Sequence, residues 1–129
     1  MLYVKTKVLS SRIHGRGLFA DEPIPEGSLV WRFTPGFDLR FTEEQMRTFP
    51  ERLQSYLDSY SWHSKKSGLY CFASDNAKYF NHSPSPNCLS AYHDEEEEVV
   101  TTTLRAIEKG EELTEDYGAF EKYFQEGCF

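Results

Sequence analysis

Apolar and polar positions alternate in several short stretches of the chain, which is the pattern of half-buried β-strands. Bulky and β-branched residues are frequent in these stretches, and turn-forming Gly and Pro residues separate them. Many short strands with little helical signal predict a mostly β domain with short helices, built of small sheets. The stretches with this pattern are 2–9, 28–33, 69–73, 89–92, 99–107 and 113–118.

The period of the pattern changes from two to 3.6 after residue 41, where helices are expected. Thr42-Glu43-Glu44-Gln45 matches a capping box, and Pro50 ends the helix that it begins. A second helical stretch follows, in which apolar residues recur at i, i+3, i+4 and i+7. We expect these four side chains to be core contacts: Leu53, Tyr56, Leu57 and Tyr60.

Length and composition favour one folded domain over residues 1–129. Aromatic residues make up 16% of the chain and charged residues 27%, which excludes a disordered segment. No apolar run approaches the ~18 residues of a membrane span, and the first residues lack the apolar core of a secretory signal. The sequence therefore predicts a soluble intracellular protein, cytoplasmic or nuclear, that does not contact membranes.

Charge is distributed unevenly along the chain, whose net charge is −7. Residues 1–20 carry four basic and no acidic side chains, whereas residues 94–126 carry twelve acidic and three basic ones. This balance argues against direct nucleic-acid binding and favours a Lys/Arg-rich protein or peptide as partner. Acidity that serves only solubility is the alternative. The acid run Glu95–Glu98 is expected to stay in water as a hairpin tip.

The segment Asn81–Cys88 is the least regular part of the chain. Its two prolines remove backbone donors, so polar side chains must define its shape. Upstream, two glycines one residue apart describe a tight turn in which the backbone approaches a neighbour closely. Each motif is weak alone, but their order is informative: His14-Gly15-Arg16-Gly17-Leu18-Phe19-Ala20, Pro25-Glu26-Gly27, Asn81-His82-Ser83 with Pro86-Asn87-Cys88, and Gly110-Glu111-Glu112-Leu113-Thr114 with Asp116-Tyr117-Gly118.

In this order and spacing, the motifs resemble those of the SET domain, the fold of protein-lysine methyltransferases. The resemblance covers about residues 3–120, and 118–129 form an aromatic tail. It implies small curved β-sheets and a C-terminal pseudoknot, a knot-like crossing in which the segment of Asp116 and Tyr117 passes the Asn81–Cys88 stretch. The zinc-binding segments that flank many SET domains are missing, so Cys88 is read as a leftover of a zinc ligand and no metal is expected.

The resemblance also implies the cofactor, the activity and the site residues. S-adenosylmethionine is the expected cofactor, and transfer of its methyl group to a lysine side chain is the expected reaction. Tyr117 takes the place of the family's catalytic tyrosine, where methyl donor and lysine meet. The residues implied to hold the cofactor are His14, Gly15, Arg16, Gly17, Asn81 and His82.

The reaction needs a neutral amine, and deprotonating a lysine of pKa near 10.4 at pH 7 costs about 4–5 kcal/mol. An apolar channel beside the cofactor's positive sulfur lowers that pKa by desolvation and like-charge repulsion. The predicted channel residues are Phe33, Tyr70, Phe72 and Glu115. Glu115 stands where the family often has Phe or Tyr, which leaves open whether one, two or three methyl groups are added. The aromatic tail from Phe120 is a candidate for closing the channel.

One alternative of another class remains. A catalytically silent SET-like module would bind a basic peptide or the cofactor without turnover, and Glu115 together with the missing flanking segments is compatible with it. The sequence also allows a homodimer.

Overall fold

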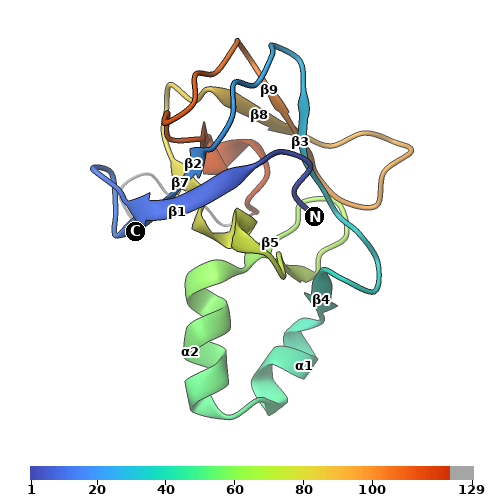
Figure 1. Cartoon of the computed structure of the whole chain (residues 1–129). Helices are drawn as coiled ribbons and strands as arrows, with labels where there is room; N and C mark the ends of the chain where they lie inside the picture. The colour runs from blue at the N-terminus through green and yellow to red at the C-terminus, as the bar shows by residue number, and fades with distance from the viewer. Residues whose placement is uncertain (123–129) are drawn as a thin grey trace.

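The computed structural model describes residues 1–122, which form four small sheets and two α-helices (Figure 1). The strands are β1 Thr6–Ser10, β2 Arg16–Ala20, β3 Leu29–Arg32, β4 Leu39–Phe41, β5 Trp62–His63, β6 Tyr70–Phe72, β7 Asn81–His82, β8 Cys88–Ala91, β9 Val100–Thr103 and β10 Thr114–Glu115. The helices are α1 Glu43–Thr48 and α2 Glu51–Tyr60, with two short 3₁₀ helices, η1 Asn76–Tyr79 and η2 Tyr117–Ala119. The mostly β prediction is therefore confirmed.

The sheets are small and mostly antiparallel. β1 pairs with β2, and two three-stranded sheets have the orders β3-β9-β8 and β4-β6-β5. The predicted hairpin is confirmed, because β8 and β9 are antiparallel neighbours. The second strand of the hairpin is shorter than the pattern suggested, since β9 ends at Thr103. Beyond it, Ile107 forms an isolated antiparallel bridge with Ile24. The last strand-like stretch likewise shrinks to β10, followed by η2.

The capping box before α1 is confirmed. The Thr42 hydroxyl accepts the Gln45 N–H at 3.0 Å, and the Gln45 side chain accepts the Thr42 N–H at 2.8 Å. These two bonds satisfy donors that the first turn of a helix leaves without partners. The helix then stops before Pro50, as expected.

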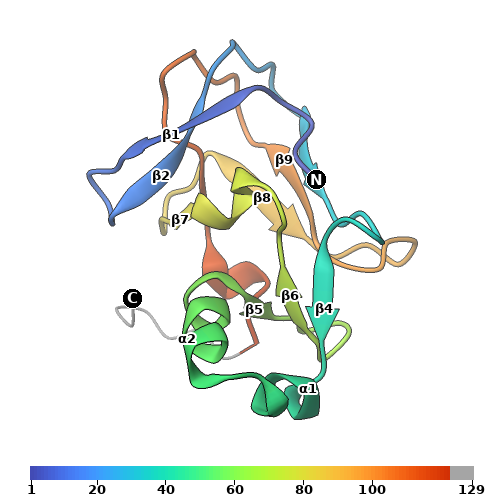
Figure 2. The same cartoon turned by 60° about the horizontal axis from the view of Figure 1, so that its bottom comes forward.

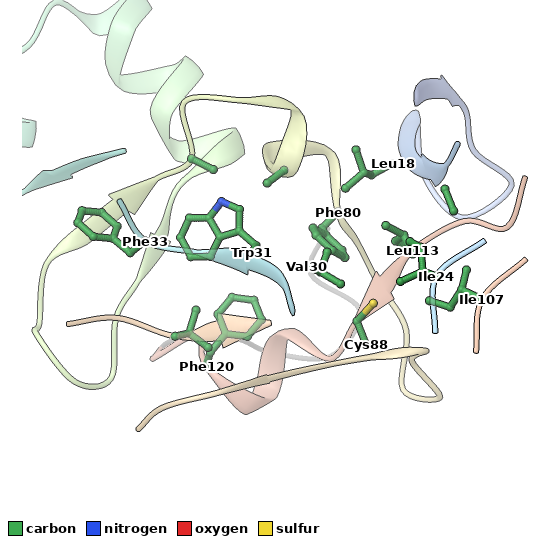
Figure 3. Close-up of a cluster of buried hydrophobic side chains, with 14 residues drawn as sticks. Leu18, Ile24, Val30, Trp31, Phe33, Phe80, Cys88, Ile107, Leu113 and Phe120 are labelled. Atoms are coloured by element: carbon green, nitrogen blue, oxygen red, sulfur yellow. The ribbon is translucent and has the colours of Figure 1, made fainter. Parts of the chain in front are cut away.

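A cluster of buried side chains, here called the main core, lies between β2, β3, β8, η1 and the C-terminal segment (Figure 3). Leu18, Val30, Cys88 and Leu113 are fully buried in it. They come from sites far apart in the chain, so the main core joins almost the whole sequence. The other buried members are Ala20, Ile24, Trp31, Phe33, Ala73, Ala77, Phe80, Val99, Ile107 and Phe120.

The two helices lie together at one end of the molecule, beside β4, β5 and β6 (Figure 2). Only Met46, Leu57 and Phe72 are buried there, a set called the helical cluster below. The prediction that all four periodic residues of α2 are core contacts was wrong for Leu53 and Tyr56, which are 40% and 42% exposed. Of the four periodic residues, only Leu57 is buried, because a short helix at the edge of a domain covers little of the core.

The most unusual connection is the parallel pairing of β7 with β10, called the crossing below. Thr114 lies opposite Asn81, and Glu115 lies opposite His82. The loop after β7 is tied to the approach of β10, since the Asn87 side chain donates to the Glu112 carbonyl at 2.8 Å and accepts the Thr114 N–H at 2.9 Å. In Figure 2 the C-terminal segment runs past β7 and β8. This is the passage that the family resemblance implied.

The acid run departs from its prediction. Glu98 is 1% exposed, and its carboxylate lies 3.4 Å from the Arg40 guanidinium. Arg40 also contacts Glu97, and Arg32 contacts Glu96 at 3.0 Å. Internal cations therefore neutralise much of this run. Its loop also projects away from β7, on the opposite side of the molecule in both views.

Within residues 1–122, no helix is both long and apolar enough to cross a membrane.

Candidate active site

A cavity of about 430 Å³ lies where the turn between β1 and β2 faces η1 and β7. The turn approaches β7 because Gly15, at a φ of +46°, adopts the left-handed conformation that favours glycine. Five of the six residues expected to hold the cofactor line this one cavity, and Tyr117 lines it as well. The expected cofactor residues brought together here are His14, Gly15, Arg16, Asn81 and His82.

The Asn81 side chain holds the cavity's shape. Its amide nitrogen donates to the carbonyls of His14 and Arg16 at 3.1 and 3.0 Å and to the Glu112 carboxylate at 2.9 Å. The Glu112 carboxylate also accepts the Ser11 hydroxyl at 2.8 and 2.9 Å. Asn81 therefore ties the turn to the C-terminal segment, and its amide hydrogens are used within the protein.

Gly17 is the sixth expected cofactor residue, and it does not line the cavity. A Cβ atom built at Gly17 would lie 2.3 Å from the Glu112 carboxylate. The two glycines predicted that the backbone approaches a neighbour closely, and at Gly17 that neighbour is the Glu112 side chain. Sequence reasoning gave Glu112 no role beyond its motif, because nothing local shows that this carboxylate reaches back to residues 11 and 81.

Tyr117 stands at the end of the crossing with both of its polar groups engaged. Its N–H donates to Nδ1 of His82 at 3.0 Å, and its hydroxyl donates to the Phe80 carbonyl. Since Nδ1 of His82 accepts this bond, the hydrogen of the ring is on Nε2. The Asp116 carboxylate lies 3.7 Å from the same Nδ1 atom. Burial raises the pKa of the Tyr117 hydroxyl, which stays protonated at neutral pH.

A second, narrower cavity of about 110 Å³ adjoins the first and is called the acceptor cavity below. Its volume is that of roughly four water molecules at about 30 Å³ each. Aromatic side chains make up much of its wall, and Glu115 lies among them. Both cavities share Ser59, Tyr60, Lys78, Phe80 and Tyr117. The aromatic lining consists of Tyr60, Trp62, Phe80, Tyr117 and Phe120.

Of the four residues expected to line a lysine channel, only Glu115 reaches the acceptor cavity. Phe33 packs edge-on against Trp31, with Arg40 over its ring at 4.7 Å. Phe72 belongs to the helical cluster, and Tyr70 stacks on the His63 ring at 4.4 Å. Tyr60 and Trp62, which line the cavity instead, come from the end of α2 and the start of β5. No local pattern in the sequence shows that this junction faces Tyr117.

Phe120 is the first residue of the aromatic tail, and it lies 4% exposed in the wall of the acceptor cavity. Its ring meets Trp62 and Tyr117 edge-on, at 6.0 and 5.9 Å between centroids. Figure 3 shows it with Trp31 and Phe80 in the main core. The remainder of the tail, from residue 123, lies outside the described residues.

Glu115, the last residue of β10 in the crossing, is an acidic residue among these aromatic side chains. Burial raises the pKa of its carboxyl group to about 7, and the hydrogen bond from the Ser90 hydroxyl, at 2.7 Å, opposes part of that rise. The Ser90 hydroxyl lies 2.8 Å from the Thr101 hydroxyl, so a short polar chain leads from Glu115 into the β8–β9 hairpin.

The described cysteines are buried and free. Burial raises the pKa of the Cys88 thiol to about 12 and also raises that of Cys71, so neither is a reactive thiolate at neutral pH. Both are fully buried in the interior, whereas Cys128 lies outside the described residues. Within residues 1–122, no group of three or more His, Cys, Asp or Glu side chains is arranged to hold a metal ion.

Comparison with known proteins agrees with this geometry. The SET domain model matches residues 15–118, which is more than half of the 129-residue chain. The chain therefore belongs to the SET domain family.

Similar proteins are histone-lysine N-methyltransferases by name. The chain is 32% identical over 125 residues to the trithorax enzyme of Drosophila virilis, a match covering 85% of this chain and 3% of the relative. It is 33% identical over 124 residues to histone-lysine N-methyltransferase 2B of Homo sapiens, covering 85% of this chain and 4% of the relative. The chain thus spans only a small part of the length of these relatives.

Solved structures show the same fold. A chain of apo ctPRC2, mutated in Ezh2, superposes with a TM-score of 0.68 at 26% identity, covering 92% of this chain and 16% of the other. A proposed histone methyltransferase of Plasmodium falciparum gives a TM-score of 0.64 at 18% identity, covering 91% of this chain and 96% of the other. Together with the strand arrangement, these likenesses confirm the SET fold.

Proposed function

We propose that this domain transfers a methyl group from S-adenosylmethionine to a lysine side chain of a basic protein. The observation that carries the proposal is the junction of two cavities along a shared wall that includes Tyr117. The wider cavity is large enough for a nucleoside-sized ligand. The acceptor cavity is narrow and aromatic, and Tyr117 lines both. A transferase that joins two substrates needs them to meet at a defined point.

The residues of the wider cavity fit a zwitterionic nucleoside. Arg16 and Lys78 are cationic partners for a carboxylate, and the rings of Tyr60 and Tyr79 are faces on which a purine can stack. His14, Asn81 and His82 complete the residues that would hold the cofactor. When bound, S-adenosylmethionine supplies an electrophilic methyl group on a positively charged sulfur.

The acceptor cavity suits the stem of a lysine. Its aromatic wall excludes water and makes the neutral amine cheaper to form. The Tyr117 hydroxyl donates to Phe80, so its oxygen presents lone pairs to the reacting groups and orients the amine. This chemistry needs no metal and no nucleophile on the protein.

The substrate is a Lys/Arg-rich segment in this proposal, and the names of the relatives make histones the first probe. The acid run contributes less to this attraction than the sequence suggested, because three of its carboxylates contact Arg32 or Arg40. Replacing Glu95–Glu98 by Gln is therefore expected to leave the Michaelis constant for histones nearly unchanged.

The proposal is tested by incubating the protein with core histones and methyl-labelled S-adenosylmethionine, beside the Tyr117→Phe variant. We expect labelling of lysine by the wild type and a loss of about 100-fold or more in kcat for the variant. Equal labelling by both proteins would remove Tyr117 from the reaction. If calorimetry shows cofactor binding but neither protein labels any histone, the catalytically silent binding module is the better description.

A further inference from the structure

A third cavity, of about 30 Å³, lies directly behind the acceptor cavity and is called the rear cavity below. Glu115 lines both cavities, and its carboxylate accepts the Ser90 hydroxyl at 2.7 Å. The residues that the two cavities share are Trp62, Ala77, Phe80, Glu115 and Phe120. The rear cavity also reaches Trp31 and Thr101, which face it from β3 and β9.

Two of the residues that line the rear cavity are tryptophans whose indole nitrogens have no acceptor among the described residues. The Nε1 atoms of Trp31 and Trp62 are buried, and neither has a hydrogen-bond partner within the part of the chain that the structure describes. A buried indole N–H normally has a partner, and leaving one without costs about 1–3 kcal/mol. The rear cavity has room for one water molecule, which needs two to four polar partners.

The hydrogen-bond directions supply those partners. The Ser90 hydroxyl gives its one hydrogen to the Glu115 carboxylate. The bond between Ser90 and Thr101 must then be donated by Thr101, which leaves a lone pair on the Thr101 oxygen. A water in the rear cavity would have the two indole N–H groups as its donors, and Glu115 and Thr101 as its acceptors.

We propose that Glu115 accepts the proton that the substrate's ammonium group must lose, with its carboxylate supported by Ser90 and by a water held between the two indoles. The inference rests on the proposed function and adds to it the proton acceptor. One ammonium N–H bond breaks, its electron pair stays on nitrogen, and the proton forms an O–H bond on the Glu115 carboxylate. The neutral amine is then ready to take the methyl group.

Charged and titratable groups of both signs lie around Glu115. Lys78 and Glu121 face it across the acceptor cavity, Tyr117 follows two residues later, His82 lies opposite it in the crossing, and Cys88 lies at the start of β8. Burial is the main influence and raises the pKa of the carboxyl group to about 7. A proton acceptor with a pKa near the working pH is half in its basic form and still holds a proton well.

The first test is the pH profile of kcat/KM for core histones, comparing the wild type with Glu115→Gln. Gln keeps the size of the side chain and still accepts the Ser90 hydrogen bond. We expect a fall on the order of 100-fold at pH 7 that shrinks as pH rises, because hydroxide takes over the deprotonation. The matched control is Glu97→Gln, which removes an exposed carboxylate on the opposite side of the molecule and should follow the wild type.

The outcomes separate the two proposals. Histone labelling with parallel pH profiles for wild type and Glu115→Gln overturns the role of Glu115 and leaves the proposed function standing. No labelling by the wild type at any pH overturns the proposed function and this inference together.

The second test needs no activity. Trp31 and Trp62 are the two tryptophans of the chain and both line the rear cavity, so intrinsic fluorescence reports on Glu115. We expect a transition with a midpoint near pH 7 in the wild type that is lost in Glu115→Gln. Because the Ser90 hydrogen bond lowers the pKa of Glu115, Ser90→Ala should move the midpoint upward. A transition that survives in Glu115→Gln contradicts the inference.

Two further variants complete the fluorescence test. Histidines also titrate near pH 6.5 in peptides, and His63 directly follows Trp62, so His63→Gln is the control. If Glu115 causes the fluorescence transition, this variant should keep it. Trp62→Phe removes one of the two N–H groups and leaves Trp31 as the reporter. If the midpoint of the fluorescence transition shifts upward in Trp62→Phe, a water between the indoles stabilises the Glu115 carboxylate. An unchanged midpoint means that no such water stabilises it.

Discussion

The crossing and the helical cluster are held together in opposite ways. In the crossing, buried polar side chains such as Asn87 and Asn81 bind backbone groups from distant parts of the chain. In the helical cluster, three buried apolar side chains from α1, α2 and β6 pack together, and a local capping box closes the start of α1. A region built on directional bonds tolerates less change than one built on apolar contact, and the residues of the proposed site, Tyr117 and Glu115, belong to the former region.

The largest effect is expected at the centre of the crossing. Asn87→Ala leaves the Glu112 carbonyl and the Thr114 N–H without partners in a buried place, at about 1–3 kcal/mol each. We expect a loss of about 4 kcal/mol in the free energy of unfolding, measured by urea denaturation. The control is Asn76→Ala, an exposed position that should change stability by less than about 0.5 kcal/mol. Equal effects of the two would mean that the crossing does not depend on Asn87.

The next effect depends on pH and concerns Glu115. Its folded-state pKa of about 7 lies above the ordinary value of 4.5, so the folded state binds more protons than the unfolded chain between these values. Stability must therefore fall as pH rises from about 4.5 to 7. Glu115→Gln removes this fall and should be more stable than the wild type at pH 8, by up to about 3 kcal/mol, with little difference at pH 4.5. Parallel stability curves for both proteins would contradict the raised pKa.

A smaller effect is expected in the helical cluster. Leu57 is 3% exposed, and Leu57→Ala should cost about 2 kcal/mol, at the low end for such a change, because this edge of the molecule can collapse around the gap. Leu53→Ala in the same helix is the control, since Leu53 is 40% exposed. Thermal unfolding of both variants measures the difference. If Leu57→Ala costs as much as Asn87→Ala, the contrast between the two regions fails.

The smallest effect is expected at the capping box. Thr42→Ala removes the hydroxyl that accepts the Gln45 N–H and should cost about 1 kcal/mol. Thr42→Ser keeps an acceptor and should restore most of that loss. The histone-labelling rate should be the same in both variants, because the cap lies outside both cavities. A changed rate would show that the helical cluster positions the site more tightly than its packing suggests.

The same contrast explains how far the sequence alone can predict this molecule. The capping box and the β8–β9 hairpin were predicted from local patterns, because period and caps are properties of neighbouring residues. Six residues were expected to hold the cofactor from a resemblance in motif order, and five of them do lie together around the wider cavity. The burial of Glu98 was missed because its partner, Arg40, lies far away in the chain.

The channel walls show the limit most clearly. Phe33, Tyr70 and Phe72 were chosen because aromatic side chains suit a lysine, but the type of a residue does not say which cavity it faces. Tyr60, Trp62 and Phe120 surround Glu115 because α2, β5 and the C-terminal segment converge there. Only tertiary structure contains that information.

The parallel pairing of β7 with β10 also determines when the site can come into existence. A ribosome makes the chain from the N-terminus, and domains complete their folding once their last pairing partner has been made. β7 has no partner in the crossing until β10 has been synthesised and laid beside it. The wider cavity therefore gains Tyr117 among its last parts, and a nascent chain that ends before residue 114 cannot yet form the junction of the two cavities.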